Sequence, residues 1–341
     1  MTKSLYSICA HNAVNGFRQY IAPQSVEIDV TNACNQACVY CNVAEYRARN
    51  TDVTRIHNYH KLIEQLATWG AIGGSGGVHT VTFVGGGEPT ARKGYEYVVE
   101  QAVDSGFLTS IVTNGTFLDR LINIPLSCIS SLAWVGVDID SGDPEVYEKV
   151  RRSKQSGLFE KAKENVKWLC TFNQRVDIKV LLHPMTIEKS SLKMTFDYLW
   201  DVRARSLYFR LALLPDNTIY TPDRETIKFI NDLAAERNIK IRINKSRLLE
   251  RSYNRCYALY MLPIFSADGN IYLCCENRGD KRYSLGSWLE GDFRSRWNSE
   301  AHKQIYDNIN AKLCKPCRPH SHNMGVQEVL DDESYFQRVF L

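Results

Sequence analysis

The chain has 341 residues, of which 44% are hydrophobic and 23% charged, as is typical of a globular protein. Its formal net charge of +4 gives no indication of nucleic-acid or membrane-surface binding. No apolar run is long enough for a membrane span, and the N-terminus lacks the apolar core of a signal peptide. Eleven cysteines in a chain without an export signal predict a cytoplasmic protein that uses cysteines for metal ligation rather than disulfides.

Short β-branched segments alternate with amphipathic helical segments over most of the chain. The predicted strands comprise residues 26–30, 80–84, 108–112, 132–139, 176–182 and 207–213. The predicted helices comprise residues 57–69, 94–105, 144–172, 190–202 and 223–237. This alternation predicts an α/β fold, a partial (β/α)6 TIM-like barrel with catalytic loops at the C-terminal ends of its parallel strands. Residues 239–243 are predicted to form a closing or linking strand.

Three cysteines follow the first predicted strand at the spacing C-x-x-x-C-x-x-C: Cys34, Cys38 and Cys41. Three thiolates hold three irons of a cuboidal 4Fe–4S cluster and leave the fourth iron open for a further ligand. Zinc sites favour C-x-x-C pairs with a second pair or histidines nearby, so a zinc knuckle is the weaker interpretation. With Tyr40 directly before its last cysteine, this run resembles the signature of the radical S-adenosylmethionine (SAM) superfamily.

The resemblance implies an enzyme in which S-adenosyl-L-methionine binds the open iron through its amino and carboxylate groups. One electron, from a flavodoxin- or ferredoxin-type donor, cleaves SAM to methionine and a 5′-deoxyadenosyl radical. That radical abstracts a hydrogen atom from the substrate. The cofactor carries the difficult step, while the protein orients the substrate and excludes water.

A glycine-rich turn follows the second predicted strand. Glycines let a ligand approach the backbone closely, although an ordinary tight turn would have the same residues. The turn lies one β/α unit after the cysteines, where it resembles the GGE motif of the superfamily. The resemblance implies that Gly86, Gly87 and Glu88 hold the amino group of SAM.

The next two strand ends carry further candidates for the SAM site. Asn114 lies in a Thr-Asn-Gly turn that many superfamily members share. Asp138 replaces the serine that is common in the family, with an acidic residue two positions later, and it could accept hydrogen bonds from the ribose hydroxyls. Arg151 could pair with the methionine carboxylate of SAM, or could lie on a solvated helix face.

Two residues near the later strands are candidates for substrate chemistry. Arg210 stands among apolar residues of the sixth predicted strand. An inward-facing arginine needs a partner and would be a candidate catalytic or substrate-binding residue, whereas an outward one would reach into solvent. His183 precedes Pro184, and this context favours a turn residue over an acid–base group.

The segment after residue 244 replaces the alternation with cysteines and short strands. Asp268-Gly269 predicts a hairpin turn that brings Cys274 close to Cys256. Four thiols could complete either a 4Fe–4S cluster or a tetrahedral zinc site. These are Cys256, Cys274, Cys314 and Cys317. Their order resembles a Twitch domain, the short form of the SPASM domain, which implies an auxiliary 4Fe–4S cluster. Cys275 is then either a buried spare thiol or a hydrogen-atom donor.

We therefore expect an N-terminal segment over residues 1–24, a radical SAM barrel over 25–244 and a small Twitch-like α+β domain over 245–341. The N-terminal segment has no assigned role, and the residues from Pro319 onward are predicted to form a polar tail.

The resemblance implies oxidation, epimerisation or elimination of a small polar substrate, such as a sugar, cyclitol or nucleoside, in a biosynthetic pathway. The pattern is similar to that of the butirosin-pathway amino-cyclitol dehydrogenase. Maturation of a ribosomally made peptide is the second interpretation, because such enzymes often carry a leader-binding domain and only twenty-four residues precede the first strand here. A non-enzymatic iron–sulfur protein is the third, and the glycine-rich turn argues against it.

Overall fold

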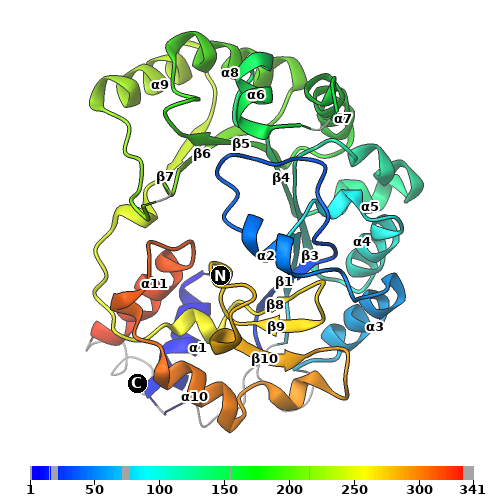
Figure 1. Ribbon diagram of the computed structural model, residues 1–341, viewed down its shortest axis with the longest axis vertical. Helices are drawn as coiled ribbons and strands as arrows, with labels where there is room; N and C mark the ends of the chain where they lie inside the picture. Colours follow the sequence, from blue (N-terminus) through cyan, green and yellow to red (C-terminus); the bar gives the residue numbers. More distant parts are fainter. Residues whose placement is uncertain are drawn as a thin grey trace.

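The computed structural model describes residues 2–14, 16, 22–70, 77–153, 155–214 and 216–332. They form a ten-stranded sheet in the order β10-β9-β8-β1-β2-β3-β4-β5-β6-β7, curved into the open ring of Figure 1. Strands β1 to β7 are all parallel to their neighbours. Their bounds are β1 (Ser25–Asp29), β2 (Thr80–Val84), β3 (Leu108–Thr113), β4 (Trp134–Asp138), β5 (Val176–Leu182), β6 (Ser206–Leu211) and β7 (Ile241–Asn244).

Helices line the outer, convex side of this curved sheet (Figure 1). The helices of this region are α2 (Ala44–Arg49), α3 (Ile56–Ala67), α4 (Tyr95–Asp104), α5 (Leu126–Ser131), α6 (Pro144–Arg151), α7 (Leu158–Phe172), α8 (Lys189–Val202) and α9 (Arg224–Glu236). Of these, α2 is the exception, because it lies in the loop that crosses the open ring. None of the described helices combines the length and apolar character that a membrane-spanning helix needs.

The predicted partial barrel is confirmed, with two differences in detail. The segment predicted as a closing or linking strand forms β7, which adds a seventh parallel strand to the sheet. The single helix predicted over residues 144–172 is two helices, because the chain turns between them. Arg152 and Gly157 adopt left-handed backbone there, with φ of 46° and 76°.

Successive residues of a strand point to opposite faces, and this alternation separates the core from the candidate site. In β1, Val26 and Ile28 are fully buried and join the hydrophobic core beneath the helices. Glu27 and Asp29 therefore face the concave side of the ring. The same alternation in β5 places Lys179 on that side. The concave face is lined by charged side chains, whereas the convex face is apolar.

The C-terminal segment continues the same sheet past β1. Its strands are β8 (Ile264–Phe265), β9 (Asn270–Tyr272) and β10 (Ser284–Ser287). The predicted hairpin turn is confirmed between β8 and β9, where Gly269 has a φ of 84°. Because β8 pairs in parallel with β1, the two predicted domains share one sheet. The boundary between residues 244 and 245 remains a prediction.

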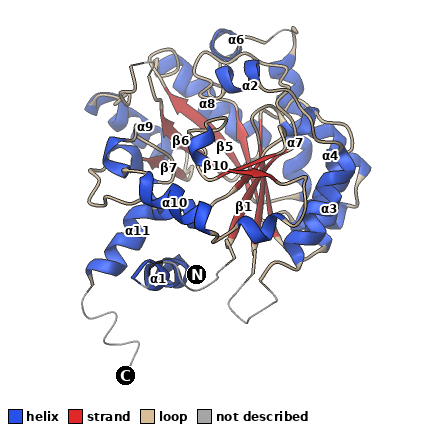
Figure 2. Cartoon of the chain, turned by 60° about the horizontal axis from the view of Figure 1, so that its bottom comes forward, coloured by secondary structure: helices blue, strands red, loops and turns tan. Residues whose placement is uncertain are grey.

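The two ends of the described chain pack against each other. Helix α1 (Thr2–Val14) contacts α11 (His320–Asp331), and the two lie side by side in Figure 2. A further helix, α10 (Glu300–Asn308), precedes α11 in the chain. The predicted polar tail is therefore wrong over residues 320–331: His320 is 2% exposed and contacts Tyr253 Oη at 2.7 Å through Nδ1. Residues 333–341, the end of that predicted tail, lie outside the described part of the chain.

Candidate active site

The cysteine loop leaves the C-terminal end of β1 and rests on the end of α6. The backbone N–H of Ala37 donates to the carbonyl of Arg151 at 3.1 Å. On the other side, Asp52 accepts the backbone N–H of Asn32 at 2.6 Å and pairs with Arg92 at 3.1 Å. These contacts hold the loop across the mouth of the ring, as the resemblance implies.

The structure brings Cys34, Cys38 and Cys41 together as three half-buried, free thiols. Burial raises the pKa of Cys38 to about 11; Arg151 opposes this effect, while Asp140 and the other two thiols add to it. Burial, and then the charge of Glu88, also raise the pKa of Cys34. Three neighbouring sulfur donors fit a cluster held by three cysteines.

Two arginines contact the sulfur atoms of this set. Arg151 Nη1 lies 3.8 Å from Cys38 Sγ, and Arg47 Nη1 lies 3.6 Å from Cys41 Sγ. Such donors stabilise thiolates and orient metal ligands from outside the coordination sphere. The signal for Arg47, its position six residues after the last cysteine, was not used in the sequence prediction.

Arg151 also forms a buried ion pair with Asp140, a residue that the sequence prediction did not place in the site. Asp140 is fully buried, has a left-handed φ of 65°, and accepts the N–H of Leu181 at 2.8 Å. Tyr40 Oη donates to the same carboxylate. A strained backbone held in place by an ion pair and two hydrogen bonds is common at functional sites. The predicted role of Arg151, binding a carboxylate of SAM, would require it to serve Asp140 as well.

Glu88 links the C-terminal ends of β2 and β3 through hydrogen bonds. Its Oε1 accepts hydrogen bonds from Thr90 and from Thr113 Oγ1 at 2.6 Å, and its Oε2 accepts the N–H of Asn114 at 2.7 Å. Burial raises the pKa of Glu88, and these hydrogen bonds counteract the effect. Among the described residues only Asn114 donates to Oε2, so this oxygen retains acceptor capacity for an amino group.

The glycines beside Glu88 are required by close packing. A Cβ at Gly87 would lie 2.0 Å from the Ala33 carbonyl oxygen, and one at Gly86 would lie 2.2 Å from Asn32 Oδ1. The turn therefore packs directly on the cysteine loop. Asn114 reinforces the contact, since its Nδ2 donates to Asn35 Oδ1 at 3.0 Å.

Asp138 lies on the concave face and is held by two cations. Arg210 Nη2 donates to Asp138 Oδ1 at 2.6 Å, and Lys179 Nζ lies 3.3 Å from the same carboxylate. Burial favours the neutral acid, but Arg210 and Lys179 outweigh it and lower the pKa of Asp138. Arg210 therefore faces inward, and His183 lies in a turn where its Nδ1 accepts the N–H of Met185.

The four C-terminal cysteines lie close to one another, and side-chain N–H groups contact three of their sulfur atoms. Asn323 Nδ2 lies 3.5 Å from Cys256, Asn277 Nδ2 3.3 Å from Cys274, and Arg251 Nη2 3.9 Å from Cys317. Burial raises the pKa of Cys256 to about 12, and the charges of Cys317 and Cys314 add to this. A set of four neighbouring thiols with N–H donors fits an iron–sulfur cluster.

Cys275 directly follows Cys274 of the C-terminal cysteine set. It is 6% exposed and packs with Tyr46, from the helix after the first cysteines, and with Tyr272. Burial raises its pKa to about 12, so the thiol is protonated at neutral pH. A protonated buried thiol in this place agrees with both sequence interpretations.

Four further charged residues of the concave face were missed: Glu27, Asp29, Arg278 and Arg318. Arg278 Nε contacts Asp29 Oδ2 at 2.8 Å, and Arg318 contacts both oxygens of Glu27, at 2.5 and 2.7 Å. The sequence signal for Glu27 and Asp29 was their alternation with the apolar residues of β1. The arginines gave no local signal.

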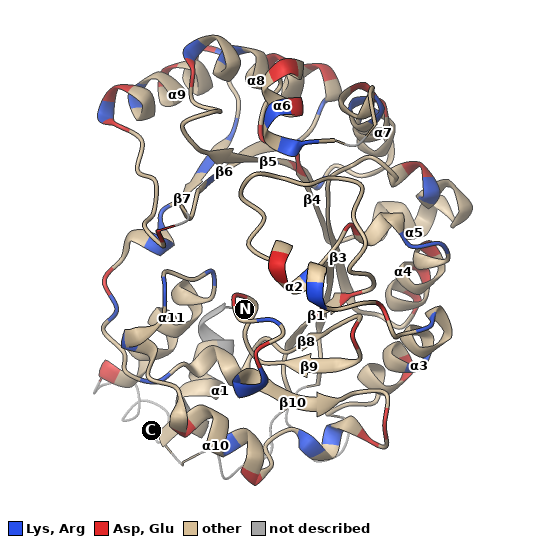
Figure 3. Ribbon diagram, viewed as in Figure 1, with Lys and Arg blue, Asp and Glu red and all other residues tan. Residues whose placement is uncertain are grey.

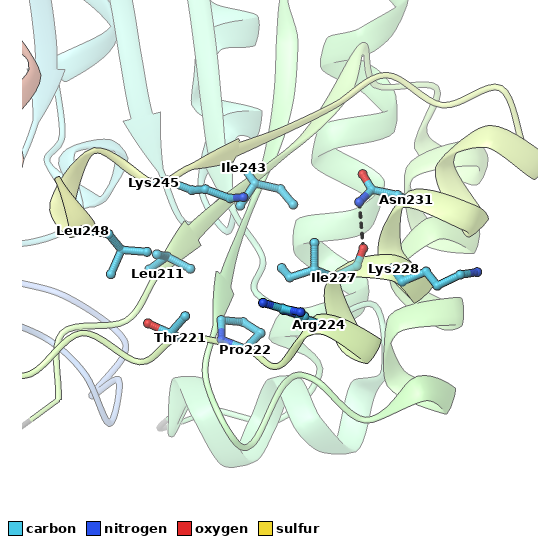
Figure 4. Close-up of a pocket in the computed structure, with 10 residues that line it drawn as sticks. All are labelled: Leu211, Thr221, Pro222, Arg224, Ile227, Lys228, Asn231, Ile243, Lys245 and Leu248. Carbon is cyan, nitrogen blue, oxygen red and sulfur yellow. Dashed lines mark hydrogen bonds between the residues drawn. The ribbon is translucent and has the colours of Figure 1, made fainter.

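A separate pocket of about 480 Å³ lies between α9 and the ends of β6 and β7 (Figure 4). Its apolar lining includes Leu211, Ile243 and Leu248, with Arg224 and Lys245 beside them. Its lining includes two predicted strand residues, Leu211 and Ile243, and none of the predicted site residues.

Comparisons with known proteins agree with both cysteine sites. A sequence model of the radical SAM superfamily matches residues 28–195, and a model of an iron–sulfur cluster-binding domain, SPASM, matches residues 256–318. The second match decides between iron–sulfur and zinc at the C-terminal cysteines in favour of iron–sulfur.

Individual relatives differ in what they act on. An S-adenosylmethionine-dependent nucleotide dehydratase from Selenomonas ruminantium is 32% identical over 120 residues, 35% of this chain and 40% of that protein. PqqA peptide cyclase from Bradyrhizobium diazoefficiens is 24% identical over 172 residues, 49% of this chain and 41% of that protein. The chain thus spans about two fifths of the length of these curated relatives.

Among solved structures, Streptococcus suis SuiB bound to precursor peptide SuiA has a TM-score of 0.65 at 14% identity, covering 92% of this chain and 75% of that chain. Native anSMEcpe with bound AdoMet has a TM-score of 0.56 at 16% identity, covering 93% and 98%. At these identities the likeness concerns the fold. The two matched models, each lying over one of the cysteine sets, show that this chain contains a radical SAM domain and a SPASM iron–sulfur domain, which imply SAM, a 4Fe–4S cluster and an auxiliary 4Fe–4S cluster as cofactors.

Proposed function

We propose that this enzyme abstracts a hydrogen atom from a small polar substrate, of sugar, cyclitol or nucleoside type, for oxidation, epimerisation or elimination in a biosynthetic pathway. The observation that supports this proposal is the charged concave face below the cysteine loop. Asp138, Lys179 and Arg210 form hydrogen-bonded ion pairs there. A substrate with several hydroxyl, amino or acidic groups fits such a surface better than an apolar one does.

We assign the first cluster to Cys34, Cys38 and Cys41 and the auxiliary cluster to the four C-terminal cysteines. When bound, the first cluster supplies the electron that cleaves SAM to the hydrogen-abstracting 5′-deoxyadenosyl radical. Glu88 and the backbone of Gly86 orient the amino group of SAM.

The remaining assigned residues hold the site together or face the substrate. Asn114 holds the glycine-rich turn against the cysteine loop. The guanidinium of Arg151 contacts Cys38 and forms an ion pair with Asp140. Arg210 and Asp138, which pair with each other, face the substrate. Cys275 is positioned as a candidate hydrogen-atom donor because its thiol stays protonated. An electron donor of flavodoxin or ferredoxin type and a cytoplasmic location complete the proposal.

The experiment compares SAM cleavage and iron content in anaerobically reconstituted protein. Cys34→Ala should abolish formation of 5′-deoxyadenosine and lower the iron content from about eight to about four atoms per chain. Cys317→Ala should retain some SAM cleavage but yield no product. SAM cleavage by well-folded Cys34→Ala protein would contradict the assignment of the first cluster.

Peptide maturation is the second candidate, because one relative is a peptide cyclase and SuiB was solved with a precursor peptide. Substrate screening separates the two. Hydrogen transfer from deuterated sugars or nucleosides into 5′-deoxyadenosine supports the first proposal, whereas transfer only from a peptide supports the second.

A further inference from the structure

Two cations on the concave face share one carboxylate. Lys179 Nζ lies 3.3 Å from both oxygens of Asp138, and Arg210 Nη2 lies 2.6 Å from Oδ1. An ammonium group has three donors and a guanidinium five, so one carboxylate leaves donors unused. The Nε of Arg210 has no hydrogen-bond partner among the described residues. Figure 3 marks basic residues on β6, which carries Arg210, and on the neighbouring β7, which carries Arg242.

Arg318 adds a third cation from the other side of the ring. It follows the last cysteine of the auxiliary set and binds Glu27 of β1. Glu27 is already paired with Arg278, at 3.3 Å. The side chain of Arg318 is 46% exposed, whereas that of Glu27 is 12% exposed, so the guanidinium keeps an accessible edge above a buried carboxylate.

Lys179 and Arg318 act on each other electrostatically although they come from opposite parts of the sheet. Burial lowers the pKa of Lys179 to about 8; Asp138 opposes this shift, and Arg210 and Arg318 add to it. The absence of a side chain at Gly136 leaves space for Lys179. A Cβ at Gly136 would lie 2.8 Å from Lys179 Cδ, so the glycine in β4 leaves space for the lysine stem.

The charges on this face are not balanced. In the connected set of contacts among the described residues, six cations meet five carboxylates: Lys179, Arg151, Arg210, Arg247, Arg278 and Arg318 against Glu27, Asp29, Asp138, Asp140 and Glu276. Cations that face one another without an intervening carboxylate repel, and an anion between them would remove this repulsion.

We propose that Lys179 and Arg210 form a binding site for an anionic group of the substrate, a phosphate or a carboxylate. This inference rests on the proposed function, since it defines which small polar substrates the enzyme takes. Asp138 lies two residues before Asp140, which contacts Arg151 at the cysteine loop. Arg210 Nη2 also lies 3.9 Å from Asp140 Oδ1, so an anion held by Arg210 would lie close to that loop and to the SAM assigned there.

The test is calorimetric titration of the reconstituted full chain with inorganic phosphate and, separately, with malonate as a carboxylate probe. We expect saturable binding of at least one anion. Lys179→Met should weaken it roughly tenfold or more, the loss expected for one charge-assisted hydrogen bond. Asp138→Asn should strengthen it, because a competing negative charge is removed. Lys189→Met, at an exposed ion pair with Glu225, is the matched control and should change nothing.

Opposite effects of the Lys179 and Asp138 variants distinguish anion binding from a general loss of structure, which would weaken binding in both. The preferred probe identifies the substrate group as phosphate or carboxylate. Absence of saturable binding to the wild-type chain, or weaker binding in both variants, would overturn the inference. SAM cleavage is measured on the same samples, so failure of the proposed radical chemistry is recognised independently of anion binding.

Discussion

Replacement of Arg278 by methionine should destabilise the protein strongly and in a pH-dependent way. The Arg278 side chain is 5% exposed and pairs with Asp29, which is fully buried, and with Glu27. Arg278→Met leaves these carboxylates without that cation, and removing one partner of a buried pair costs about 3–5 kcal/mol. For a chain of this length, with an unfolding entropy of roughly 0.7 kcal/mol/K, the melting temperature should fall by about 4–7 °C.

The pH dependence follows from Asp29. Its pKa is already raised, from 3.8 to about 6, by burial and by Glu27, against the opposing effect of Arg278. A carboxyl group whose folded pKa lies above its unfolded value stabilises the fold at low pH, and this contribution is lost as pH rises through the folded pKa. Without Arg278 the folded pKa rises further. The destabilisation should therefore be complete at about pH 8 and smaller near pH 5, where Asp29 is protonated.

Urea unfolding of wild type and variant at both pH values measures the effect. Arg282→Met is the matched control: this arginine is 77% exposed in its ion pair with Asp280, so the loss should stay below about 1 kcal/mol. The double variant Arg278→Met/Asp29→Asn should recover part of the loss. A penalty below about 1 kcal/mol, or one that is equal at pH 5 and pH 8, would refute this reasoning.

Three further predictions concern the cofactor sites. Gly87→Ala should reduce iron bound by the first cysteine set, because its Cβ would meet the Ala33 carbonyl oxygen at 2.0 Å. Gly106→Ala, whose φ of 84° strains the backbone but whose Cβ meets no atom within 4 Å, should retain its iron. Glu88→Gln replaces one carboxylate oxygen by an NH2 group, which faces the donors that now bind this oxygen. The variant should bind SAM about tenfold more weakly in equilibrium dialysis, and an unchanged dissociation constant would exclude Glu88 from the SAM site. Cys275→Ala should retain SAM cleavage but slow product formation at least tenfold, and equal rates of the same product would exclude the thiol as donor.

The barrel was predictable because its strands bury one face against helices. Apolar residues at alternate positions, such as Val26 and Ile28, report this burial in the sequence itself. The cysteine spacing was equally informative, because a cluster fixes the distance between its ligands along the chain. Both signals are local, and both need only a few neighbouring residues to be recognised.

The ion pairs of the concave face could not be predicted in the same way. Arg278 and Asp29 are 249 residues apart in sequence, and they meet only because β8 is placed beside β1. The C-terminal helix was missed for a similar reason: polar residues in it are buried by contacts with distant side chains, as His320 is beside Tyr253. Hydrophobic periodicity carries no information about such long-range polar contacts.

The pairing of β8 with β1 also has a consequence for synthesis on the ribosome. Glu27 of β1 is placed opposite Ile264, so this strand emerges roughly 240 residues before its neighbour. At about 5–20 residues per second, one edge of β1 stays uncovered for roughly 10–50 s. An open strand edge is a template for pairing with other chains. Fragments that end before β8 should therefore aggregate, and productive folding of the nascent barrel depends on protecting that edge until the last quarter of the chain is made.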